Sequence, residues 1–108
     1  MKDIDFVSMF SFAIALKRGK TSPNLSHEEV CNGISEELDE LRQATDEPSE
    51  HIPPYTQRQE ELADIILAAL TELEMLGNRY YQAGRKDIAD LASKIIAAKL
   101  EYNRVRKD

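Results

Sequence analysis

A helical pattern is clearest in residues 26–45, SHEEVCNGISEELDELRQAT. Ser26 is followed three residues later by Glu29, which makes a capping box, the side-chain pattern that begins a helix. Apolar residues then recur at helical spacing from Val30 to Leu41 and define one stripe along the segment. The stretch therefore predicts an amphipathic helix over about residues 26–45.

The segment before this helix predicts another one. Asp3 or Asp5 can cap a first helix, which runs to about Arg18. Gly19 follows at the position where a glycine commonly ends a helix, and residues 20–25 then form a turn. Strand signals are nearly absent from the sequence, so the helix pattern favours an all-α fold.

Two more helices are predicted downstream. Thr56 and Gln59 repeat the capping box and begin a third helix. The sequence leaves its end open, because the helix can stop at Gly77 or continue and be capped at Gly84. Asp87 is expected to cap a fourth helix that reaches nearly to the C-terminus. Four helices joined by short and medium loops predict a four-helix bundle-like protomer.

Composition limits the class of protein. With 108 residues the chain has room for one domain, over residues 1–108. Its net charge of −6 argues against a nucleic-acid polymer as partner, since such binders present a basic face. The apolar runs 6–16 and 62–70 are too short to span a membrane, and acidic residues precede the first, which is the wrong charge order for a signal peptide. A lone cysteine, Cys31, favours a reducing compartment, so we expect a cytoplasmic protein.

Acidic residues lie on the apolar side of two of the predicted helices. On the helix predicted over residues 26–45, Glu37 falls inside the apolar arc. Glu40 falls at the edge of that arc, and Glu36 lies one step further out. On the next, Asp64 interrupts an apolar run and Glu61 lies one turn earlier on the same face. If these pairs converge, they form an oxygen-rich site suited to Mg²⁺ or Mn²⁺. The alternative is two amphipathic helices whose acids face solvent or pair with lysines.

The last predicted helix carries donor groups along one face. Lys99 falls within its apolar stripe, and Asn103 and Arg106 follow at the next turns. Phosphate oxygens are a natural partner for such a line of groups. The alternative is that this end overhangs the core, where basic residues favour a helix C-terminus in any case.

The histidines argue against one rival chemistry. Di-iron carboxylate bundles need a histidine three residues after a glutamate on two helices. His27 lies at a helix start and His51 in a proline-rich loop, and neither has that spacing. A di-iron site is therefore not expected.

Three motifs together resemble a known family. EELDE at residues 36–40 is an EExxE, ELAD at residues 61–64 is an ExxD, and KLEYNRVR at residues 99–106 fits K-x-x-Y-N-x-x-R. In this order they resemble the all-α nucleoside triphosphate pyrophosphohydrolase superfamily, the MazG-like proteins with their dUTPase and phosphoribosyl-ATP pyrophosphatase relatives. The resemblance covers about residues 26–106.

The resemblance implies a magnesium-dependent enzyme that hydrolyses nucleoside or deoxynucleoside triphosphates to the monophosphate and pyrophosphate, with Mn²⁺ as a possible substitute. By position it implies that the metal ligands are Glu37, Glu40, Glu61 and Asp64. It implies that Glu36 is a further ligand or the catalytic base that orients the attacking water. Metal ions suit this chemistry because they neutralise the triphosphate and make a bound water acidic.

The resemblance also implies a substrate-binding set and an assembly. Lys99, Asn103 and Arg106 match positions that meet phosphate or nucleotide, and Tyr102 packs beside them. Family members assemble as homodimers or homotetramers, and an apolar run at residues 62–70 fits burial at a subunit interface. The alternative function is a non-catalytic helical dimer that binds a nucleotide or a protein partner.

Overall fold

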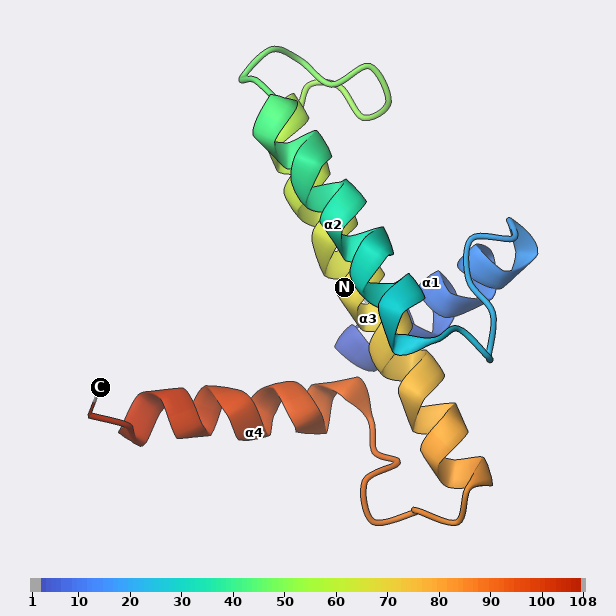
Figure 1. Cartoon of the computed structure of the whole chain (residues 1–108). Helices are drawn as coiled ribbons and strands as arrows, with labels where there is room; N and C mark the ends of the chain where they lie inside the picture. The colour runs from blue at the N-terminus through green and yellow to red at the C-terminus, as the bar shows by residue number, and fades with distance from the viewer. Residues whose placement is uncertain (1–2, 108) are drawn as a thin grey trace. The chain divides into compact units, whose positions relative to one another are not determined.

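The structure, a computed structural model, describes residues 3–107. Within this range the regular structure is helical, apart from an isolated β-bridge between Pro48 and Thr56. The predicted all-α class is therefore confirmed (Figure 1). The four helices are α1 (Ile4–Lys17), α2 (His27–Gln43), α3 (Gln57–Gln82) and α4 (Ala92–Val105).

Side-chain caps begin the first three helices where the sequence predicts them. Asp3 accepts a backbone hydrogen bond at the start of α1, 2.8 Å long. At α2, the Ser26 hydroxyl accepts from the Glu29 N–H at 3.1 Å, and the Glu29 carboxylate accepts from the Ser26 N–H at 3.0 Å. Thr56 and Gln59 make the same reciprocal pair before α3, at 3.2 and 2.9 Å. Both predicted capping boxes are thus confirmed.

Two glycines end helices in the left-handed conformation. Gly19 after α1 has φ 70° and Gly84 after α3 has φ 82°, a region that side chains with a Cβ rarely adopt. After α3 the Arg85 N–H reaches back to the Tyr80 carbonyl at 2.8 Å, which satisfies a carbonyl that the helix itself leaves free. The longer alternative for this helix is therefore right, and Gly77 lies inside it.

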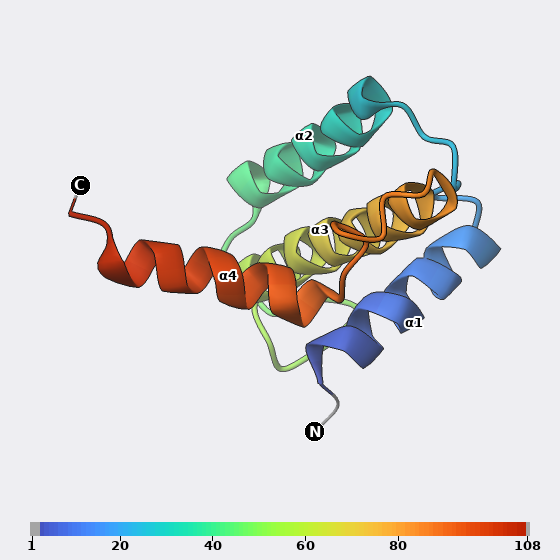
Figure 2. The ribbon, with the colours of Figure 1, turned by 90° about the horizontal axis from the view of Figure 1, so that it is seen from below.

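The predicted start of the last helix was wrong. α4 begins at Ala92 with Leu91 as its N-cap residue, so Asp87 lies outside the helix. Its carboxylate accepts two hydrogen bonds from the Arg85 guanidinium instead, at 3.0 and 2.9 Å. The first turn of α4 instead meets a carboxylate from α1. Asp5 accepts hydrogen bonds from the Ser93 N–H at 2.8 Å and from its hydroxyl at 2.6 Å. The ribbon shows the start of α4 beside the first part of α1 (Figure 2).

The described chain divides into two compact units: residues 3–23 with 70–107, and residues 24–69. The first unit holds α1, α4 and the second part of α3, and α1 contacts α4. Its polar links include Ser8, whose hydroxyl shares its one hydrogen between two acceptors, the Leu70 carbonyl at 3.2 Å and the Glu74 carboxylate at 3.0 Å. Its buried apolar side chains are those of Phe12, Leu70, Met75 and Ala92.

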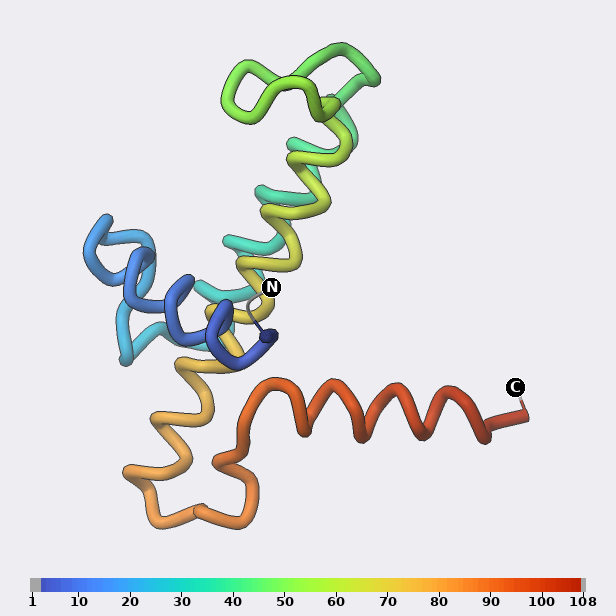
Figure 3. Tube along the Cα trace, turned by 180° about the vertical axis from the view of Figure 1, so that it is seen from behind, coloured from blue at the N-terminus to red at the C-terminus, as the bar shows by residue number. Residues whose placement is uncertain are grey.

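The second unit is a helical hairpin. α2 and the first part of α3 run antiparallel and are joined by residues 44–56 (Figures 1 and 3). The described apolar side chains that are buried all lie in the first unit, so this hairpin has none of its own. Leu62 and Ile66 of α3 are 51% and 58% exposed. Even so, none of the helices found in residues 3–107 combines the length and apolar character needed to cross a lipid bilayer.

Candidate metal centre

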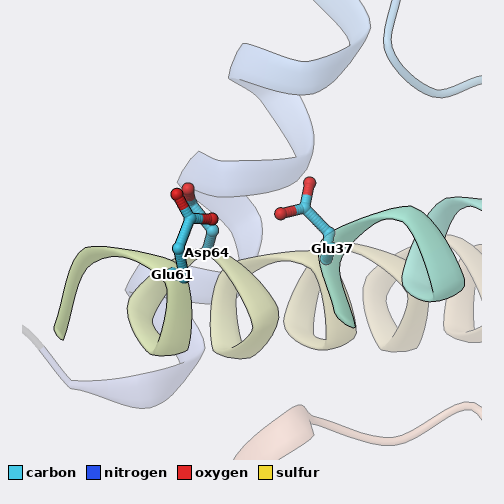
Figure 4. A group of neighbouring side chains, drawn as sticks. All are labelled: Glu37, Glu61 and Asp64. Atoms are coloured by element: carbon cyan, nitrogen blue, oxygen red, sulfur yellow. The ribbon is translucent and has the colours of Figure 1, made fainter. Parts of the chain in front are cut away.

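Three carboxylates converge between the two helices of the hairpin. Glu37 comes from α2, and Glu61 and Asp64 come from α3 (Figure 4). One oxygen of each lies within 4.8 Å of the others. The spacing of three residues places the two α3 acids on the same helix face, and the antiparallel neighbour presents Glu37 towards them. The structure therefore brings together three of the four residues that the resemblance names as metal ligands.

The remaining acids of the EExxE motif border this group. Glu40 lies one turn after Glu37, is exposed, and is outside the three-oxygen group. It is nevertheless close enough that its charge raises the pKa of Glu37 and of Glu61. Glu36 is exposed on α2, and its charge also contributes to the raised pKa of Glu37.

The group is electrostatically unfavourable without a cation. Burial is the largest cause that raises the pKa of Glu37 and of Glu61, and the negative charges of Glu40 and Asp64 add to it. One oxygen of Glu37 and one of Glu61, the Oε2 atoms, are buried and receive no hydrogen bond from residues 3–107. Buried carboxylate oxygens normally accept a hydrogen bond or contact a cation. These two oxygens have no donor, so their negative charge is not compensated by the described residues.

A hard divalent cation fits this donor set. Its atoms are carboxylate oxygens, with neither sulfur nor imidazole among them, which favours Mg²⁺ or Mn²⁺ over zinc or copper. Three carboxylates also leave coordination positions for water or a phosphate oxygen, as magnesium sites in proteins commonly do. Two of the three ligand residues, Glu37 and Glu61, each have a buried oxygen without a donor, and a cation would balance the negative charge of their carboxylates.

The predicted substrate-binding residues lie in the other unit. Lys99, Tyr102 and Asn103 are exposed on α4, and Arg106 is its C-cap residue. The Lys99 ammonium lies 4.5 Å from the centre of the Tyr102 ring, a cation–π contact within one helix. These residues and the three carboxylates belong to different units of the chain, and a shared role in binding substrate stays a prediction.

A pocket beside the carboxylates was missed by the sequence reasoning. Its volume is about 350 Å³, and it shares Glu61 with the three-oxygen group. His51 lines it from the loop between α2 and α3, a segment whose conformation no hydrophobic period predicts. The lining residues are Glu40, Gln43, Ala44, Glu50, His51, Gln57, Glu60 and Glu61.

Comparisons with protein-family models, with curated proteins and with solved structures found no match to this chain. The resemblance to the pyrophosphohydrolase superfamily therefore depends on the sequence motifs alone. What the chain can do has to be inferred from the chemistry of the site.

Proposed function

We propose that this protein is a magnesium-dependent nucleoside triphosphate pyrophosphohydrolase of the MazG-like kind, which hydrolyses a nucleoside or deoxynucleoside triphosphate to the monophosphate and pyrophosphate. The observation that carries the proposal is the convergence of Glu37, Glu61 and Asp64, with two buried oxygens that have no hydrogen-bond donor among residues 3–107. The order of the EExxE, ExxD and K-x-x-Y-N-x-x-R motifs supports this reaction class over other uses of a magnesium site.

Each acid of the site has a role in this proposal. Glu37, Glu61 and Asp64 hold the ion, and Glu40 extends the ligand set at its border. Bound Mg²⁺ supplies charge neutralisation of the polyphosphate and a water of lowered pKa. Glu36, exposed one residue before Glu37, orients the attacking water and accepts its proton.

The donor groups of α4 are assigned to the substrate. Lys99, Asn103 and Arg106 bind phosphate or nucleotide, and Tyr102 packs beside them. Support comes from their exposure, which leaves them accessible to a ligand, and from the cation–π contact that holds the Lys99 ammonium beside Tyr102.

We infer that the chain forms bundle-like protomers that assemble as a homodimer or homotetramer in the cytoplasm. The hairpin of residues 24–69 exposes Leu62 and Ile66 and has no buried apolar side chain among its described residues. Burying such side chains against a second copy is favourable by about 1.5–3 kcal/mol for each one fully buried. A monomer in analytical ultracentrifugation at micromolar concentration contradicts the assembly.

Pyrophosphate release tests the activity. A panel of nucleoside and deoxynucleoside triphosphates is incubated with the protein and Mg²⁺, and we expect release with at least one of them. Glu61→Gln and Asp64→Asn should reduce release to background while the helical circular dichroism is kept. Asp39→Asn is the matched control, because Asp39 is exposed on α2 and pairs with Arg42 at 2.6 Å, away from the group. Nucleotide binding without hydrolysis would instead support the non-catalytic alternative.

A further inference from the structure

The loop before α3 is fixed to the first turn of that helix by one carboxylate. Ser49, 3% exposed, donates from its hydroxyl to Glu60 Oε1 at 2.5 Å. The same hydroxyl oxygen accepts hydrogen bonds from the backbone N–H groups of His51 and Ile52, both at 3.1 Å. A backbone hydrogen bond within the loop joins residues on either side of His51, since the Ser49 N–H donates to the Tyr55 carbonyl at 2.7 Å. These bonds define the position of the His51 backbone.

The His51 ring is held by the other oxygen of the same carboxylate. Its Nδ1 lies 2.8 Å from Glu60 Oε2. Hydrogen bonding to Glu60 is the largest cause that raises the pKa of His51. The raised pKa makes the doubly protonated ring more populated than in a free histidine, and in that form both nitrogens are donors. Nδ1 donates its hydrogen bond to Glu60, so Nε2 is the nitrogen that can donate to a ligand.

The pocket that His51 lines adjoins the proposed metal centre. Glu61 belongs to both, and Glu40, which borders the centre, is also part of the pocket wall. Among the lining residues, His51 is the one whose side chain can carry a positive charge. An anion in this pocket would be repelled by the carboxylate walls, except next to a bound cation and next to His51.

We propose that His51 binds a phosphate oxygen of the polyphosphate, donating from Nε2 while Nδ1 donates to Glu60. The inference rests on the proposed function, because it takes the polyphosphate to be held at the Glu37, Glu61 and Asp64 group. A polyphosphate carries more negative charge than one divalent ion balances, so a cationic donor in the pocket beside the ion would strengthen its binding in addition to Lys99 and Arg106. His51 is a substrate-binding residue in this arrangement, and Glu60 is a positioning residue that acts through it.

The test distinguishes the role of Nε2 of His51 from that of Nδ1. His51→Asn keeps an amide donor near the Nδ1 position for Glu60 and removes the donor at Nε2. In the full chain with saturating Mg²⁺, we expect KM for the best triphosphate and the Kd of inorganic pyrophosphate to rise about tenfold. The kcat should change less than KM, and the Kd for Mg²⁺ measured alone by calorimetry should stay unchanged.

Two further variants complete the design. Glu60→Gln keeps a hydrogen-bond partner for the ring but removes the charge, so we expect about a threefold rise in KM. His27→Asn is the matched control, because His27 is an exposed histidine at the start of α2 and does not line the pocket. It should leave all of these values unchanged.

The outcomes distinguish this inference from the proposed function. If the parent hydrolyses triphosphates and His51→Asn keeps its KM and pyrophosphate Kd, His51 does not bind phosphate. If His51→Asn weakens Mg²⁺ binding instead, His51 is a metal ligand and the inference is wrong. If the parent neither hydrolyses a triphosphate nor binds pyrophosphate with Mg²⁺, the proposed function itself fails, whatever the variants do.

Discussion

Glu37→Gln is expected to stabilise the metal-free protein, which is the opposite of what most substitutions do. Oxygens of Glu37, Glu61 and Asp64 lie within 4.8 Å of one another. Two unit charges at 4.8 Å repel by about 3.5 kcal/mol at an effective dielectric constant of 20 and by about 0.9 kcal/mol in water. Because the three residues are partly exposed, solvent screening places the gain near the lower value, at about 1 kcal/mol.

The order of stabilities should reverse when Mg²⁺ is added. The ion binds the folded protein, and at a concentration one hundred times its Kd the parent gains about 2.7 kcal/mol in the free energy of unfolding. Glu37→Gln has lost a charged ligand and should gain much less. The parent is then the more stable of the two, although it is the less stable in EDTA.

Urea unfolding followed by circular dichroism measures both states, first in EDTA and then in Mg²⁺, at one fixed protein concentration. Asp39→Asn is the control, since it makes the same charge change on the same helix and should alter stability by less than about 0.5 kcal/mol. The reasoning is refuted if Glu37→Gln is less stable than the parent in EDTA, or if Mg²⁺ stabilises both proteins equally.

Two further predictions concern pH and the helix ends. Because the pKa values of Glu37 and Glu61 are raised, protons compete with the ion, and Mg²⁺ affinity measured by calorimetry should fall as the pH drops through those raised values. The stability of the metal-free protein should change in the opposite direction. Because the raised pKa values let the folded state take up protons before the unfolded state does, the free energy of unfolding should increase as the pH falls through these values. Gly84→Ala should destabilise by about 1 kcal/mol because φ is 82° there, whereas Gly77→Ala, inside α3 where a Cβ meets nothing closer than 3.8 Å, should stabilise by about 0.5–1 kcal/mol. If urea unfolding shows the same change in the free energy of unfolding for Gly84→Ala and Gly77→Ala, this prediction is wrong.

Local chemistry explains which parts of the fold were predictable. The starts of α2 and α3 depend on residues three apart in the sequence, such as Ser26 with Glu29, so the sequence alone locates them. The start of α4 depends on Asp5, which is far away in the sequence and reaches Ser93 only in the folded chain. Asp87 has the right residue type for a cap, but α4 begins five residues later, and the Asp87 carboxylate pairs with Arg85 in the preceding loop.

The candidate site also has residues that the sequence predicts and a contact that it does not predict. Glu37, Glu61 and Asp64 were predictable because helical periodicity puts each acid on an apolar face, where its charge is out of place. The link between His51 and Glu60 was not predictable, because it depends on a loop conformation set by hydrogen bonds between the loop and α3. An aperiodic segment leaves no pattern in the sequence from which such a contact could be inferred.

The hairpin of residues 24–69 combines two features that oppose its own stability. It has no buried apolar side chain among its described residues, and it carries a group of carboxylates that repel one another. The helix caps and the bonds of Ser49 to the loop and Glu60 are polar contacts worth about 1 kcal/mol each, which is little against the entropy of ordering the chain. A bound divalent ion would remove the repulsion, and apolar contact of Leu62 and Ile66 with a second copy would supply the missing burial. In the proposed enzyme, the features that weaken this unit in isolation are therefore those that bind the metal and the partner subunit.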